Sequence, residues 1–106
     1  MASPVFTYMW EYDVKNEHQD AFEHAYGSEG EWVRFFSNSN AYLSTELHRD
    51  IERPNRFITV DYWTSKAARD NFQKRYESEF HKIDKACEAF TVSEKLIGEF
   101  ECYKTY

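Results

Sequence analysis

The sequence predicts an α+β fold in which one antiparallel sheet carries helices on one face. Two segments rich in β-branched and aromatic residues, 42–49 and 56–63, are separated by a short loop, which indicates an antiparallel hairpin. Segments with helical periodicity precede and follow this hairpin, and a strand-like segment stands towards each end of the chain. With right-handed crossovers this order gives the ferredoxin-like βαββαβ arrangement.

The first strand is predicted over 5–12 (VFTYMWEY). Its side chains alternate between two sets, and both sets contain apolar residues. One set is Phe6, Tyr8, Trp10 and Tyr12, and the other is Val5, Thr7, Met9 and Glu11. Apolar residues on both faces are typical of a strand that is covered on both sides.

Two helices are predicted between the first strand and the hairpin. Asn16, followed three residues later by Gln19, fits a capping box, and Gly27 fits the left-handed residue that ends a helix. Ser28 and Glu31 fit a second capping box. The residues expected to face inward are Ala21, Phe22, Ala25 and Tyr26 in the first helix, and Trp32, Val33, Phe35 and Phe36 in the second.

Simple alternation assigns two faces to each hairpin strand. In 42–49, Leu43, Thr45 and Leu47 lie opposite Tyr42, Ser44, Glu46 and His48. In 56–63, Ile58, Val60 and Tyr62 lie opposite Phe57, Thr59, Asp61 and Trp63.

The longest helical pattern follows Ser65, which can cap it. A continuous apolar stripe is formed by Ala68, Phe72, Tyr76, Phe80, Ile83 and Cys87. The last strand is predicted over 92–103, with Leu96, Gly98 and Phe100 on one face. Glycine within a strand indicates a bulge or a close backbone approach.

Composition indicates one domain, residues 1–106, with more apolar surface than one core can hide. Aromatic residues make up 19% of the 106 residues, and each can remove ~150–250 Å² from water. The surplus predicts a second buried surface, either a ligand cavity or a partner interface. A second copy related by a two-fold axis would cover the helix-free face, so we expect a homodimer.

Charge and motifs exclude several classes of function. A net charge of −6 without a basic stripe argues against nucleic acid and against anionic membranes. No apolar run reaches the ~20 residues of a membrane span, and the start of the chain does not resemble a signal peptide, so we expect a cytoplasmic protein. The two cysteines, Cys87 and Cys102, are expected to be reduced. No nucleotide, zinc or hydrolase motif is present, and we expect no metal.

The hairpin sequence YLSTELHRD at 42–50 and RFITVDYWTS at 56–65 resembles the core of the antibiotic biosynthesis monooxygenase family. The resemblance extends from about Phe6 to Glu101. It implies a dimeric α+β barrel with a pocket between sheet and helices. The best-known members of this family oxidise phenolic or quinol-like molecules with O₂ and without a cofactor.

Position by position, the resemblance supports one pocket residue. Trp63 matches a pocket tryptophan of the family, whereas Thr59 stands where those members have asparagine and Arg69 stands near a pocket tyrosine. A haem-degrading branch requires an asparagine on the first strand, which is absent over 5–12, and a helix histidine that His81 does not match.

The sequence nominates Trp63, His48 and Asp61 as catalytic residues, with histidine and a buried carboxylate as possible general bases. An aromatic substrate pocket is expected from Tyr8, Trp10, Trp32, Phe36, Phe72 and Tyr76. The alternatives are core packing for the rings, a solvated or interface position for His48, and a salt bridge for Asp61. The leading function is a cofactor-free monooxygenase acting on a small aromatic molecule. The alternatives are a non-catalytic dimeric binding or accessory protein and a haem-binding protein.

Overall fold

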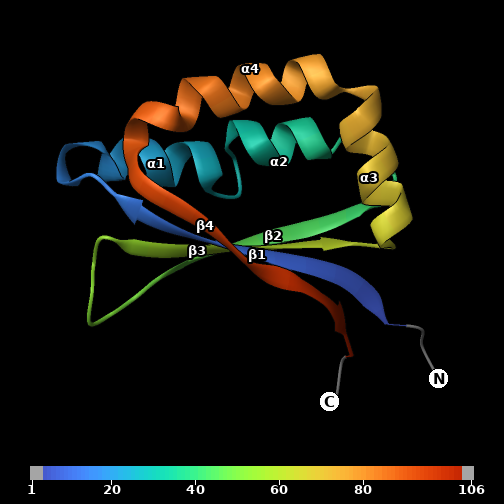
Figure 1. The fold of residues 1–106 in the computed structure, drawn as a ribbon, viewed down its shortest axis with the longest axis horizontal. Coiled ribbons are helices and arrows are strands. Elements are labelled where there is room, and N and C mark those ends of the chain that lie inside the picture. The colour runs from blue at the N-terminus through green and yellow to red at the C-terminus, as the bar shows by residue number, and fades with distance from the viewer. Residues whose placement is uncertain (1–3, 104–106) are drawn as a thin grey trace.

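The computed structural model describes residues 4–103. Its elements are β1 (Val5–Val14), η1 (Asn16–His18), α1 (Gln19–Tyr26), α2 (Glu31–Phe36), β2 (Tyr42–Arg49), β3 (Arg56–Trp63), α3 (Lys66–Arg75), α4 (Glu77–Cys87), η2 (Glu88–Phe90) and β4 (Thr91–Cys102). The four strands form one antiparallel sheet in the order β2-β3-β1-β4. Helices α1, α2 and α4 lie over one face of the sheet, and α3 stands at one end (Figure 1). The predicted ferredoxin-like α+β fold is confirmed.

The core lies between the sheet and the helices and is built mainly from aromatic rings. Phe22 of α1 is fully buried, and its ring centroid lies 4.2 Å from Tyr26, 5.1 Å from Tyr12 and 5.1 Å from Phe57. The even-numbered side chains of β1 supply the sheet side of this core, as the alternation predicts. The strand continues two residues beyond the prediction because Val14 is also fully buried.

Both edge strands contain a bulge that changes the predicted faces. In β2 the pairing shifts between Tyr42 and Ser44, so Tyr42 packs on the helix side against Trp63 instead of sharing a face with Ser44. In β4 the shift falls at Ile97, so Leu96 pairs with Trp10 while Gly98 pairs with Met9. Leu96 therefore faces the helices and Phe100 the opposite face, and the prediction of one shared face was wrong. The bulge that Gly98 indicates is confirmed.

The two predicted capping boxes do not form. Asn16 lies in the 3-10 turn η1, and its side-chain oxygen accepts a hydrogen bond of 2.7 Å from Asn55 instead of capping α1. Helix α2 is preceded by Gly30 and has no side-chain cap.

Gly27 is extended (φ −82°) and not left-handed. Close packing explains why glycine stands at this position, because a Cβ atom would lie 2.6 Å from the Glu23 carbonyl oxygen.

The long apolar stripe after Ser65 belongs to two helices. Ser65 accepts a 3.1 Å hydrogen bond from the Ala68 N–H, which confirms the predicted cap. The predicted continuous helix is interrupted at Tyr76 (φ −112°, ψ 33°), where the chain turns from α3 to α4 (Figure 1). The Tyr76 ring packs on Phe72 at 4.8 Å, so the stripe stays against the core although the axis turns. Within residues 4–103, no helix is long and apolar enough to cross a membrane.

Candidate functional site

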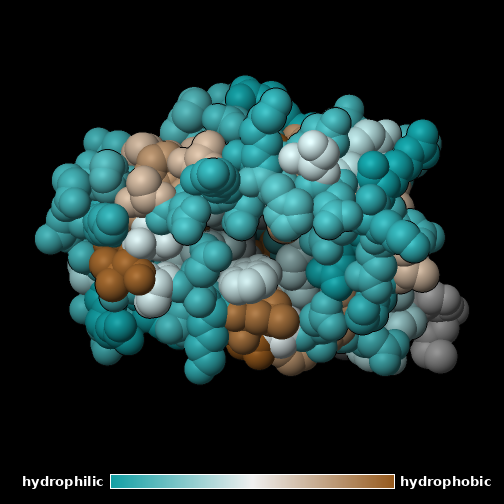
Figure 2. All heavy atoms as spheres, turned by 45° about the horizontal axis from the view of Figure 1, so that its top comes forward, coloured by the Kyte–Doolittle hydropathy of each residue, from teal (hydrophilic) through white to brown (hydrophobic). Residues whose placement is uncertain are grey.

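A cavity of about 270 Å³ lies between the sheet and the helices. This volume is near the lower end of the range for small-molecule sites. Figure 2 shows a hollow near the centre of the face that carries the helices, with hydrophobic side chains beside it. The cavity is lined by Tyr8, Trp10, Tyr12, Tyr26, Trp32, Phe36, Thr45, Thr59, Asp61, Arg69, Gln73, Phe80, Asp84, Glu94, Leu96 and Glu99.

Asp61 is the buried acid of this cavity. It lies on β3 directly opposite Tyr8 of β1 and Thr45 of β2, because those residues pair in the sheet. The Thr45 hydroxyl donates a hydrogen bond to Asp61 Oδ1, and the Tyr42 hydroxyl lies 2.6 Å from the Thr45 hydroxyl. Only 6% of Asp61 is exposed, and this burial raises its pKa to about 6 even though the Thr45 hydrogen bond and the Arg69 charge oppose the shift. Asp61 is therefore a carboxylate that titrates near neutrality.

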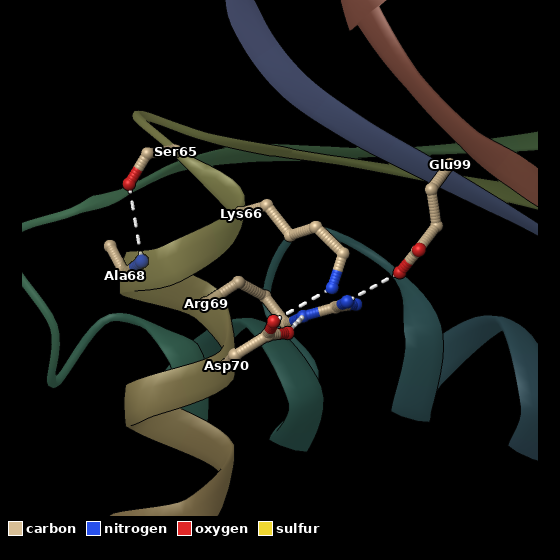
Figure 3. Close-up of polar contacts among 6 residues, drawn as sticks. All are labelled: Ser65, Lys66, Ala68, Arg69, Asp70 and Glu99. Carbon is tan, nitrogen blue, oxygen red and sulfur yellow. Dashed lines mark hydrogen bonds and ion pairs between the residues drawn. The ribbon is translucent and has the colours of Figure 1, made fainter.

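Arg69 lies on the first turns of α3, and four contacts hold its guanidinium group. Its carbon Cζ stands 4.5 Å from the centre of the Tyr8 ring and 5.0 Å from that of Phe6. Nη2 donates to Glu99 on β4 at 2.5 Å, and Nε donates to Asp70 at 2.8 Å (Figure 3).

Asp70 in turn accepts a 2.7 Å contact from Lys66 one helical turn earlier (Figure 3). Ser65 anchors the start of this helix. These contacts fix Arg69 in place, and cation–π attraction to Tyr8 adds to the ion pairs.

Tyr8 completes this end of the cavity as a neutral hydroxyl group. Burial raises the pKa of Tyr8 far above its usual range, and the neighbouring Asp61 carboxylate raises it further. The phenol therefore stays protonated and can donate a hydrogen bond. The arrangement of a titratable carboxylate, a protonated phenol and a fixed guanidinium can accept a proton and stabilise the anion that is left.

The other end of the cavity also combines aromatic rings with carboxylates. The Tyr12 hydroxyl lies 3.3 Å from the Thr59 hydroxyl, and burial raises the pKa of Tyr12 well above its usual range. Asp84 of α4 and Glu94 of β4 also line this end. Burial raises the pKa of Glu94, and the Asp84 charge adds to the shift.

The structure brings five of the nine nominated residues to the cavity. Those residues are Tyr8, Trp10, Trp32, Phe36 and Asp61. Trp63, Phe72 and Tyr76 do not line it. Trp63 is fully buried behind the lining, and its ring lies 5.5 Å from Phe36, 5.4 Å from Tyr42 and 5.4 Å from Phe72.

His48 lies elsewhere. It is exposed on the helix-free face of the sheet, and its Nε2 stands 3.2 Å from Glu46. No histidine lines the cavity, and within residues 4–103 no group of three His, Cys, Asp or Glu side chains could hold a metal ion.

Sequence reasoning missed several lining residues, above all Thr45, Arg69 and Glu99. A signal for Thr45 was available, because antiparallel pairing of the hairpin places it beside Asp61. No sequence signal identified Glu99, because the bulge at Ile97 decides which face it takes.

Comparisons with known proteins agree with this architecture. None of the curated protein sequences compared with the chain matches it. Among solved structures, the cofactor-independent oxygenase SnoaB from Streptomyces nogalater shares 17% identity with a TM-score of 0.71, covering 97% of each chain. A putative antibiotic biosynthesis monooxygenase from Bordetella bronchiseptica shares 16% identity (TM-score 0.72), covering 97% of this chain and 99% of that one.

A conserved protein from Methanosarcina mazei Go1 shares 10% identity (TM-score 0.71), covering 95% of each chain. These likenesses support the fold. The family model described as antibiotic biosynthesis monooxygenase matches residues 5–83, which is most of the chain. With a matching sequence model and a matching fold, the chain belongs to the antibiotic biosynthesis monooxygenase family.

Proposed function

We propose that this protein is a cofactor-independent monooxygenase that binds a small phenolic or quinol-like molecule in the cavity, with Asp61 as the general base. One observation carries the proposal: a buried carboxylate with a pKa of about 6 lies at a ring-lined cavity that also contains a fixed guanidinium group. A base whose pKa lies near the working pH is ionised in much of the protein and is still basic enough to take a proton from the substrate.

In this mechanism Asp61 removes the proton of the substrate hydroxyl. Arg69 and the Tyr8 hydroxyl stabilise the resulting oxyanion, since both are held next to Asp61. The electron-rich anion then reacts with O₂ at a ring carbon that bears one hydrogen. One oxygen atom becomes the new carbonyl oxygen, and the other leaves as water with that hydrogen and the hydroxyl proton that Asp61 had taken. The aromatic walls exclude bulk water from the intermediates.

The working unit that we propose is a homodimer formed through the helix-free face of the sheet. Phe100 of β4 is 43% exposed on this face. It pairs with Thr7 of β1, which in turn pairs with Tyr62 of β3. The neighbouring bulge residue Ile97 is 41% exposed. A second copy would remove these side chains from water. A cytoplasmic location also stays a prediction.

A second candidate function is a non-catalytic binding protein. Thr59 stands where the oxygenases have an asparagine, and its hydroxyl lies within hydrogen-bonding distance of Tyr12. Trp63, which matches the family's pocket tryptophan, is sealed behind Phe36 and does not line the cavity. These two observations favour binding without turnover.

Oxygen uptake tests the enzyme proposal. A panel of 2-naphthol, 1,4-naphthohydroquinone and anthrone is added to the protein in an oxygen electrode, with spontaneous oxidation subtracted. We expect uptake with at least one compound and a loss of about 100-fold or more in Asp61→Asn, because loss of a general base has effects of this size. Asp13→Asn, the same change on the helix-free face, should keep the rate. Binding of a panel member without oxygen uptake would instead support the second candidate.

A further inference from the structure

The cavity has two chemically different ends, which lie at two different levels along the paired strands β1 and β4. Tyr8 pairs with Glu99 at the end that contains Asp61, whereas Tyr12 pairs with Glu94 at the other. The two levels are four residues apart along β1, which corresponds to about 13 Å at the usual rise per residue. A ligand that fills the cavity therefore touches both ends.

Four aromatic rings surround the second end. The ring centroids of Tyr12 and Tyr26 are 5.1 Å apart, those of Tyr26 and Trp32 are 6.0 Å apart, and those of Trp32 and Phe80 are 5.3 Å apart. All four side chains line the cavity together with Asp84 and Glu94. We call these six residues the acidic aromatic end. Aromatic faces beside carboxylates are the surroundings that organic ammonium groups prefer in proteins.

The two carboxylates of the acidic aromatic end have no cationic partner. Within residues 4–103, neither Asp84 nor Glu94 forms an ion pair, whereas Glu99 at the other end is neutralised by Arg69 at 2.5 Å. The Glu94 charge also contributes to the raised pKa of both Tyr12 and Tyr26, so it acts on the rings that line this end.

A further polar group at this end is unsatisfied. Trp32 is 7% exposed, and its indole N–H lies close to the Tyr26 hydroxyl and the Cys87 thiol without a well-aligned hydrogen bond to any partner in the described part of the chain. Buried donors of this kind are rare unless a ligand or water satisfies them. A polar atom of a ligand next to its charged group could accept this bond.

We infer that the cavity takes an aromatic molecule with a hydroxyl group at one end and a protonated amine at the other. The inference rests on the proposed function, because it places the reacting hydroxyl at Asp61 and Arg69. The ammonium group then lies among the rings of the acidic aromatic end and neutralises Asp84 and Glu94. An acidic ligand of the same shape is rejected, because its carboxylate would face two carboxylates.

Isothermal titration calorimetry with three matched naphthols tests this charge selection. The compounds are 6-(2-aminoethyl)-2-naphthol, its neutral 2-hydroxyethyl analogue and the corresponding naphthylacetic acid. We expect the amine to bind at least tenfold more tightly than the alcohol, and the acid to bind more weakly than both. The preference should shrink as salt is raised, since the two carboxylates are partly exposed.

A variant that combines Asp84→Asn with Glu94→Gln should lose the preference for the amine and keep its affinity for the alcohol. Neither residue is more than partly buried, so the double variant should fold. Glu79→Gln, on the same helix α4 but outside the cavity, should keep the preference.

Equal binding of amine and alcohol by the wild-type protein would overturn the inference and leave the proposed function standing. Amine selectivity without oxygen uptake would support the inference and count against the enzyme. If none of the three naphthols bound, the cavity would not be a site for hydroxylated aromatics, and both proposals would fall.

Discussion

Asp61→Asn tests the buried carboxylate on which the proposed chemistry depends. Burial raises the pKa of Asp61 from 3.8 to about 6, so the folded protein holds this proton more tightly than the unfolded chain. The stabilisation from the group is therefore fully present below pH 3.8 and is lost as the pH rises through about 6. These two pKa values correspond to a loss of about 2 kcal/mol by pH 5 and about 3 kcal/mol by pH 7. Asparagine has a similar shape and does not ionise, so the variant avoids this loss.

Urea unfolding of both proteins between pH 4 and pH 8, at one protein concentration, measures the effect. The free energy of unfolding of the variant minus that of the wild type should rise by about 2 kcal/mol from pH 4 to pH 7. Other titrating groups are common to both proteins and cancel. The Thr45 hydroxyl can still donate to the asparagine oxygen, so the hydrogen bond survives. Thr45→Val removes that donor while Asp61 stays in place. The free energy of unfolding of this variant should therefore fall more steeply with pH than that of the wild type. A difference that stays constant with pH would refute the argument that Asp61 is a buried, raised-pKa acid.

Four further substitutions test the fold and the proposed dimer. Phe100→Asp should convert a dimer to a monomer in sedimentation velocity, and an unchanged mass would contradict the proposed interface. Phe22→Ala, in the fully buried centre of the aromatic core, should lower the free energy of unfolding by about 3–5 kcal/mol in urea titrations. Ser65→Ala should lower it by about 1 kcal/mol, because it removes the cap of α3. Gly30→Ala should lower the melting temperature, because the added Cβ would lie 2.2 Å from the Ala25 carbonyl oxygen; an unchanged melting temperature would show that the α1–α2 turn can relax.

Element order and the inward face of β1 could be predicted from the sequence, because alternation and helical spacing report burial directly. Tyr8 was nominated as a ring of the pocket and Asp61 as a buried carboxylate, and antiparallel pairing brings them face to face. The first capping box failed because the Asn16 side chain bonds to Asn55, a residue 39 positions away. Local motifs compete with such tertiary partners, and a single sequence does not show the outcome. The turn at Tyr76 was missed for a similar reason, since the apolar spacing continues through it.

The bulge at Ile97 links the candidate site to the proposed dimer face. With regular pairing, Gly98 and Phe100 would face the cavity together with Leu96, and Glu99 would point away from the helices. The extra residue reverses this alternation for the rest of β4. As a result Glu99 reaches Arg69 and holds its guanidinium over Tyr8, while Phe100 is placed on the helix-free face. One inserted residue therefore supplies both the anchor of the cationic group in the cavity and an apolar side chain for a partner. A change that straightened this bulge should weaken ligand binding and association together, although the two sites lie on opposite faces of the sheet.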